Sequence, residues 1–316
     1  HIYYIGTSVQ PMFKTVDGAT RVKIGGYGRL ECNNIAYAFD ARNKGGQRVS
    51  YIDFTDLNII NATMFAYVAG GAYCSFERLK CYASDETFNG GFIFDNQGTF
   101  TELCIVRDCK MSGIKHNNEQ LHPMINIIGS INNTIEHCDI NDNDGPSIVI
   151  STERGESYSN VIFNNNFYSR GNYIEINTQH LVNNNIITHN SFILNGTTGN
   201  AAIKLNYVSA SLLNTTIANN MFRVVTGEKV AENKCIISNI NNKVMLHGNC
   251  YLSVPIPQPN SSHSSWYNLD LPNGYAGTVT MVPGQATYVI TLTSHSPYTY
   301  IPAYAIALNF SADYHA

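Results

Sequence analysis

The sequence is poor in charge and has no long apolar run, and these two features exclude several classes of protein. Aspartate, glutamate, lysine and arginine make up 13% of its 316 residues, against about 25% in an average soluble domain. The net charge of −4 gives no basic footprint for nucleic acid. No apolar stretch approaches the roughly 18 residues that span a bilayer. We therefore expect neither a nucleic-acid partner nor membrane insertion.

Helical periodicity and metal-ligand spacing are also missing. Apolar residues do not recur at i, i+3, i+4 and i+7, which argues against helices. The eight cysteines contain no paired C-x-x-C motifs, so we expect no zinc site and small, reduced core residues instead of a disulfide framework. Asp142 and Asp144 resemble part of a calcium turn, but the other ligands are absent, and an ordinary turn is predicted. We expect no metal and no cofactor.

The sequence does contain a repeated motif, with inward residues at i, i+2, i+5 and i+7. Its copies begin at residues 52, 74, 104, 133, 160, 185, 215 and 244, so the steps are 22, 30, 29, 27, 25, 30 and 29 residues. Residues i and i+2 point the same way on a strand, and the step of three to i+5 indicates a bend. The amides at i+5 can stack and hydrogen-bond from rung to rung; they are Asn165, Asn190, Asn220 and Asn249.

A further strand follows most copies, at residues 92–94, 125–127, 148–150, 174–176, 203–205 and 236–238. Unequal repeats are compatible with a solenoid, in which insertions become loops on one face, whereas a leucine-rich horseshoe or a propeller needs more regular units. The sequence thus predicts an all-β fold, a right-handed parallel β-helix with rungs of about 23 to 30 residues over 1–252. After a Pro/Ser-rich linker, residues 253–316 are predicted to form a small C-terminal antiparallel β module.

These rungs, with asparagine at the bend and turns of unequal length, resemble the pectate-lyase-like β-helix superfamily over roughly residues 20 to 252. Within it, the chain is most similar to bacteriophage tailspike or tail-fibre polysaccharide depolymerases. The resemblance implies an enzyme that cuts bacterial capsule or O-antigen, a homotrimer, and a place on the virion tail, with a secreted pectinase-like enzyme as the alternative. The start at His1 without methionine leads us to expect a fragment of a longer protein.

The outward columns of the repeat contain a first candidate site. Glycoside hydrolysis needs two carboxyl groups, about 6.5–9.5 Å apart in inverting enzymes, and two rungs separate Glu77 from Glu136 by about 9.6 Å of backbone. The candidate catalytic residues here are Glu136, Asp108 and Glu77, and the candidate substrate-binding residues are Arg107, His137 and Asp139. The alternative interpretation is a solvated ladder of ion pairs, Glu77–Arg107–Glu136 beside Arg78–Asp108.

A second candidate site lies on the further strands that follow the copies of the repeat. Glu175 and Lys204 are expected to be outward neighbours, with Asn126 and Val149 before them. The candidate catalytic residues are Glu153 and Glu175, and the candidate binding residues are Arg154, Glu156, Tyr173 and Lys204.

Three functions follow from these candidates. The first is a hydrolase that uses paired carboxylates on a surface polysaccharide. The second is a lyase that acts on a uronate-containing glycan, with His137 or Lys204 as the base and Arg107 as the cation. The third is a receptor-binding spike without catalysis.

Overall fold

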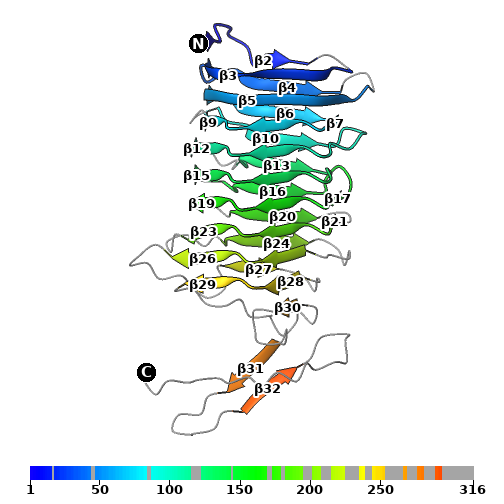
Figure 1. Cartoon of the computed structure of the whole chain (residues 1–316), viewed down its shortest axis with the longest axis vertical. Coiled ribbons are helices and arrows are strands. Elements are labelled where there is room, and N and C mark those ends of the chain that lie inside the picture. The colour runs from blue at the N-terminus through cyan, green and yellow to red at the C-terminus, as the bar shows by residue number, and fades with distance from the viewer. Residues whose placement is uncertain are drawn as a thin grey trace.

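The computed structural model shows a parallel β-solenoid whose rungs stack from the N-terminus downward (Figure 1). It describes residues 1–15, 18–43, 47–83, 87–114, 122–143, 145–168, 173–178, 182–194, 201–207, 215–224, 235–238, 244–252, 266–268, 276–280 and 289–293. Every regular element in these ranges is a strand. Consequently, none of the described residues belongs to a helix that is long and apolar enough to cross a membrane.

One face of the solenoid is a nine-stranded parallel sheet, here called the front sheet. Its strands are β2 (Pro11–Lys14), β4 (Tyr37–Arg42), β6 (Met64–Ala69), β10 (Gly90–Asp95), β13 (Ile125–Ile128), β16 (Ile148–Ser151), β20 (Ile174–Thr178), β24 (Ile203–Tyr207) and β27 (Ile236–Ser238).

Two further ladders form the rest of the wall. They begin together in the long strands β3 (Thr20–Glu31) and β5 (Val49–Ala62). The first ladder continues through β8 (Ser75–Glu77), β11 (Ile105–Arg107), β14 (Thr134–Glu136), β18 (Val161–Phe163), β22 (Ile186–Thr188), β25 (Thr215–Ala218), β28 (Val244–His247) and β30 (Trp266–Asn268). The second continues through β9 (Lys80–Ala83), β12 (Lys110–Ile114), β15 (Asp139–Asn143), β19 (Asn166–Tyr168), β23 (Ser191–Leu194), β26 (Met221–Val224) and β29 (Cys250–Leu252).

The strand pairing confirms the predicted repeat at every step. The central residues of the first ladder pair in the order Phe54, Phe76, Val106, Ile135, Ile162, Ile187, Ile217 and Leu246, which are the i+2 positions of the eight copies. The front-sheet strands pair in the predicted register as well, from Phe92 through Ile125, Ile148, Ile174 and Ile203 to Ile236. The predicted parallel β-helix is therefore confirmed.

Left-handed residues form two corners in the rungs where these corners are described. The bend between the two ladders has a positive φ at i+4, in Asp56, Arg78, Asp108, His137, Asn164, His189, Asn219 and Gly248. The corner before the first ladder has one at i−1, in Tyr51, Tyr73, Leu103, Asn132, Ser159 and Asn184. This conformation costs an ordinary L-residue about 1–2 kcal/mol, and it turns the chain within one residue.

Buried asparagines connect the rungs inside the coil. In the predicted ladder, the backbone N–H and side-chain amide of Asn190 both donate to Oδ1 of Asn220, at 2.9 and 3.0 Å. Asn133, Asn160 and Asn185 form a second ladder at position i, in which Asn160 donates to Asn185 at 3.0 and 3.1 Å. Such bonds satisfy amides that would otherwise be costly to bury.

Apolar side chains fill the remaining interior. Phe167, Phe192 and Phe222 stack with ring centroids 4.9 and 5.0 Å apart. The cysteines are free thiols, as predicted, and all except Cys250 are buried. Burial raises the pKa of Cys32 and Cys235 to about 12, which keeps these thiols protonated and unreactive.

One complete rung precedes the first predicted copy. Val22 pairs with Ile52 and Leu30 pairs with Ile59, but the register shifts between Gly25 and Gly28. This bulge adds one residue to the motif, so the repeat at 22, 24, 28 and 30 does not match the i, i+2, i+5, i+7 spacing. Tyr27 projects from the bulge and is fully exposed.

The remaining short strands are β1 (Ile2–Tyr3), β7 (Gly71–Ala72), β17 (Ser157–Tyr158), β21 (Val182–Asn183), β31 (Ala276–Thr280) and β32 (Val289–Thr293). Each pairs with one other strand: β1 with β3, β7 with β5, β17 with β21, and β31 with β32. The last two form an antiparallel pair. The first ladder extends past residue 252, because β30 pairs with β28. The division into domains 1–252 and 253–316 stays a prediction.

Candidate functional site

The outer face of the two ladders brings the first set of predicted residues together. Glu77, Arg107 and Glu136 are successive partners on β8, β11 and β14. They point outward because their neighbours Phe76, Val106 and Ile135 fill the core. The predicted placement of this column is confirmed.

Arginines link the carboxylates of this face. Arg107 contacts Glu136, Nε to Oε1, at 2.5 Å, and its Nη1 lies 3.8 Å from Oε1 of Glu77. Arg78 contacts Glu77 at 3.1 Å and Asp56 through two nitrogens at 2.7 and 2.9 Å. The hydrogen bond that Arg107 donates to Glu136 raises the pKa of Arg107, and the hydrogen bond that Arg78 donates to Asp56 lowers the pKa of Asp56. The ladder of ion pairs is thus present, although Arg78 pairs with Asp56 and not with Asp108.

The left-handed bend presents two more predicted residues to solvent. Asp108 and His137 occupy this bend on successive rungs, with Oδ1 of Asp108 3.7 Å from Nδ1 of His137. Their side chains are 45% and 41% exposed. Beyond the bend, Asp139 pairs with Lys110 across the strands and accepts a 2.9 Å hydrogen bond from the amide of Asn166. The acidic band therefore continues onto the second ladder.

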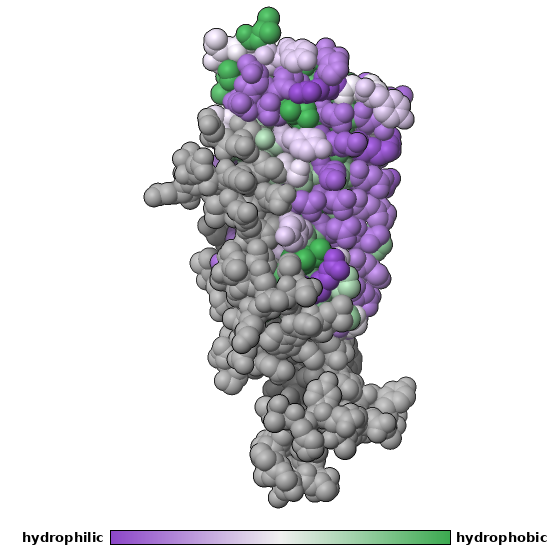
Figure 2. Space-filling view, turned by 90° about the vertical axis from the view of Figure 1, so that its left-hand side faces the viewer, coloured by the Kyte–Doolittle hydropathy of each residue, from purple (hydrophilic) through white to green (hydrophobic). Residues whose placement is uncertain are grey.

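Figure 2 looks at the side of the solenoid where β9, β12, β15, β19 and β23 lie, and the described surface there is mainly hydrophilic. Isolated apolar groups interrupt it. This hydrophilic surface has acids, bases and amides on adjoining rungs, and these groups can donate and accept hydrogen bonds to a ligand rich in hydroxyl groups.

The front sheet holds the second set of predicted residues. Glu175 pairs with Lys204 and with Val149, and Val149 pairs with Asn126, as expected. Glu175 and Lys204 are half-buried, and the amide of Asn177 lies 3.5 Å from the Glu175 carboxylate.

Tyr173 does not lie on the surface, so the prediction that its ring contacts a glycan is wrong. Its ring is 2% exposed and packs against Phe167 and Phe192, and its hydroxyl donates to the carbonyl of Ile193. The strand β20 begins only at Ile174, so the outward alternation does not extend back to Tyr173.

The loop after β16 folds back towards the N-terminal rungs. Arg154 reaches Asp95 on β10, two rungs away, with an Nη1 to Oδ2 contact. Gly129 lies beneath the loop with a φ of 55°, and a Cβ there would come within 2.9 Å of the Arg154 carbonyl carbon. Glu153 and Glu156 are exposed on this loop. The loop thus extends towards β10, whereas Glu175 lies on β20, on the other side of β16.

Asp95 is the centre of a polar cluster that sequence reasoning missed. Its carboxylate is buried and accepts hydrogen bonds from Tyr67 at 2.5 Å and Gln97 at 3.3 Å, besides Arg154. Burial and the bond to Asp95 raise the pKa of Tyr67 to about 12. The signal in the sequence was an acid at an outward position directly after the predicted strand 92–94, which the structure extends to Asp95, but nothing indicated the distant loop that covers it.

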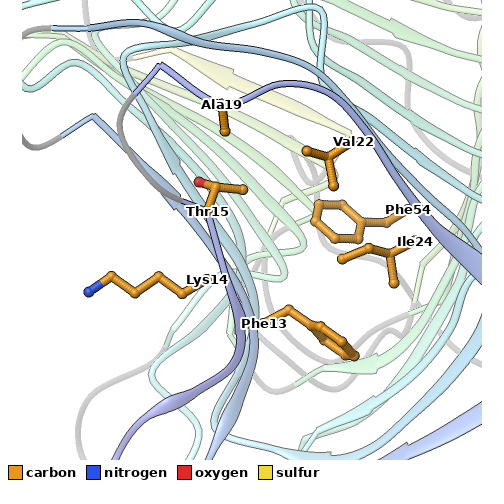
Figure 3. A pocket seen from close by; sticks show the side chains of 7 residues that line it. All are labelled: Phe13, Lys14, Thr15, Ala19, Val22, Ile24 and Phe54. Carbon is orange, nitrogen blue, oxygen red and sulfur yellow. The ribbon is translucent and has the colours of Figure 1, made fainter.

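The described cavity at the N-terminal end has a different character. Its volume is about 230 Å³, and its walls come mainly from Phe13, Val22, Ile24 and Phe54, with the amino group of Lys14 pointing away from these side chains (Figure 3). An apolar space of this kind lacks the convergent polar groups of a sugar site. Among the described residues, no cluster of three or more His, Cys, Asp or Glu could hold a metal ion.

Comparison with known proteins gives structural matches only. No family model matches the sequence, and no curated protein matches it. A mutant tailspike of E. coli bacteriophage HK620 in complex with a hexasaccharide superposes with a TM-score of 0.55 and 10% identity, over 76% of this chain and 47% of that chain. A double mutant of the same tailspike gives 0.53 and 10%, over 82% and 57%.

Pectate lyase Pel9A gives a TM-score of 0.42 and 14% identity, over 74% of this chain and 69% of that chain. The chain spans about half the length of the tailspike chains. The tailspike superpositions confirm the parallel β-helix and the resemblance to a tailspike body. Because the identity is only 10%, this resemblance is one of fold.

Proposed function

We propose that this protein is a tailspike-type depolymerase that binds and hydrolyses a bacterial surface polysaccharide, capsule or O-antigen, with carboxylates on the outer face of the two ladders. The observation that supports this most is the band of acids on successive rungs, Glu77, Asp108, Glu136 and Asp139, with Arg107 among them. A tailspike of the same fold is known in complex with a hexasaccharide, and a long solenoid face suits an extended glycan.

The ion pairs suggest a role for each carboxylate. Arg107 contacts Glu136 at 2.5 Å and holds its carboxylate in place on the outer face, which suits a base that takes a proton from the attacking water. Asp108 lies on the neighbouring rung, is 45% exposed, and is accessible to the glycosidic oxygen that must receive a proton. Glu77 is the alternative partner. Arg107 contacts both glutamates, so their oxygens are at most roughly 9 Å apart, and this upper bound is compatible with the separation of about 6.5–9.5 Å in an inverting pair.

A lyase is the second candidate, because His137 lies next to Asp108 and Arg107 is on the same face. In this reaction the base removes a proton beside a uronate carboxylate, a cation neutralises that carboxylate, and the glycosidic oxygen leaves from the adjacent carbon as its C–O bond breaks. The products would carry a new carbon–carbon double bond and absorb ultraviolet light, whereas hydrolysis products would not. A homotrimer on a virion tail fits either enzyme and belongs to the same proposal.

Site-directed variants test the assignment. Capsule and O-antigen preparations from several bacteria are digested and read by mass and by absorbance. We expect Glu136→Gln and Asp108→Asn to lower the rate by 100-fold or more, in line with the usual contribution of a general acid or base of about 10²–10⁴. Glu153→Gln and Glu175→Gln, which remove the predicted acids of the front-sheet site, should cut at the normal rate. The reverse pattern would move the reaction to the front sheet.

A further inference from the structure

The charged column on the first ladder ends at an outward aromatic residue. Phe163 on β18 is the strand partner of Glu136 and of Thr188. Its neighbour Ile162 is fully buried in the core, while Phe163 is half-buried on the outer face. A phenyl ring is not needed there to fill the interior, since the inward positions of this rung are already occupied by Ile162 and Phe167.

Two imidazoles hold this ring from the neighbouring rungs. His137 lies with its ring centroid 5.7 Å from that of Phe163 and an interplanar angle of 67°. His189 lies on the opposite side at 5.4 Å and 65°. Both histidines occupy the left-handed bend and are exposed, and His189 Nδ1 is 2.9 Å from the Thr188 hydroxyl. The three rings form a surface cluster with restricted side-chain freedom.

Amide and carboxylate groups border this cluster on the same rungs. Asn164 at the bend and Asn166 on β19 are exposed, and Asn166 donates to Asp139 at 2.9 Å. That bond uses one of the two amide hydrogens of Asn166 and one carboxylate oxygen of Asp139, so donor and acceptor capacity is left over. The carboxylate of Glu136 lies one rung from Phe163, and that of Asp108 lies on the rung beyond it.

Resting on the proposed function, we infer that His137, Phe163 and His189, with Asn164 and Asn166, form a sugar-binding subsite beside the cutting carboxylates. Its ligand is a pyranose whose apolar C–H face packs on the rings while its hydroxyl groups bond the amides. Rings with little side-chain freedom lose little entropy on binding. Neighbouring rungs are about 4.8 Å apart, so the subsite adjoins Glu136 within one sugar ring.

Binding must be measured separately from cleavage. All variants are made in the Glu136→Gln background, and the affinity for each of a panel of purified O-antigen and capsular polysaccharides is measured by calorimetry. For the polysaccharide that Glu136→Gln binds, we expect Phe163→Ala to weaken binding about tenfold or more, as loss of an aromatic contact does. Phe163→Tyr should retain it. Tyr27→Ala, which removes a fully exposed ring in the bulge of β3, is the matched control and should bind normally.

The outcomes separate the two proposals. Binding by Phe163→Ala within twofold of the Tyr27→Ala control, with unchanged circular dichroism, overturns the subsite even if the unaltered protein cuts the glycan. Loss of binding in Phe163→Ala, when the unaltered protein cuts nothing, supports the subsite and overturns the hydrolase. Failure to bind any polysaccharide of the panel overturns both.

Discussion

The asparagine ladder provides the sharpest test of how the solenoid is stabilised, and Asn190→Ala is the perturbation. Asn190 is 1% exposed. Its Oδ1 accepts from the backbone and side chain of Asn165 at 2.9 and 3.0 Å. Its amide donates to the carbonyl of Ile162 at 2.9 Å and to Oδ1 of Asn220 at 3.0 Å. One side chain therefore joins three rungs.

The expected destabilisation follows from the groups that alanine would leave without partners. Asn190→Ala removes four hydrogen bonds within the coil, and each buried group left unsatisfied costs about 1–3 kcal/mol. Because some of these groups keep other partners, we expect the free energy of unfolding to fall by about 3–5 kcal/mol. Ser191→Ala, a half-buried outward neighbour, should change it by less than about 0.5 kcal/mol.

Urea unfolding followed by circular dichroism measures both variants. Asn190→Asp adds a check on the sign of the pH dependence: burial raises the pKa of an acid, so this variant should be most stable when protonated and should lose stability as the pH rises above about 3.9. A free energy for Asn190→Ala within about 1 kcal/mol of Ser191→Ala would refute the ladder as a source of stability.

Three further predictions concern other parts of the solenoid. Leu103 has a φ of 55° at a corner where the next rung has Asn132, so Leu103→Asn should raise stability by up to about 1 kcal/mol; a lower melting temperature would contradict this. Arg78 lowers the pKa of Asp56, so the ion pair stabilises the fold above the unfolded pKa of 3.8, and this contribution is lost as the pH falls through the folded pKa. The free energy of unfolding should therefore differ less between about pH 5 and about pH 2 for Arg78→Gln than for the unaltered chain. Cys250 is the one exposed thiol, so iodoacetamide should label a single cysteine in the folded protein by mass, and labelling of several would show that the core opens.

The sequence predicts the register of the rungs because burial on one side of each strand imposes a strict alternation. From Ile52 to Leu246, the inward residues follow the i, i+2, i+5, i+7 frame, and the observed pairing keeps them in register. The register shift between Ile59 and Ala62 falls after position i+7, outside this frame. The rung at Val22 escaped recognition because the bulge at Gly26 adds a residue. A period search cannot identify a copy in which the bend itself has a different length.

The candidate sites are harder to predict, because side-chain contacts between rungs depend on loops. The outward column Glu77–Arg107–Glu136 follows from the register alone. The pairing of Arg154 with Asp95 depends on a loop that folds back over Gly129, and no local pattern encodes that direction. Tyr173 shows the same limit at a strand end, where alternation stops and packing decides which way a ring points.

The proposed hydrolysis is tested most directly by letting the protein digest the polysaccharide that it cuts in water labelled with heavy oxygen. The account predicts shorter oligosaccharides that each gain one water, with the heavy oxygen at the new reducing end, and cleavage by Glu136→Gln that is slower by about 100-fold or more. Products that gain ultraviolet absorbance without heavy oxygen would contradict hydrolysis and point to elimination. Binding without any cleavage would contradict an enzyme and leave a receptor-binding solenoid.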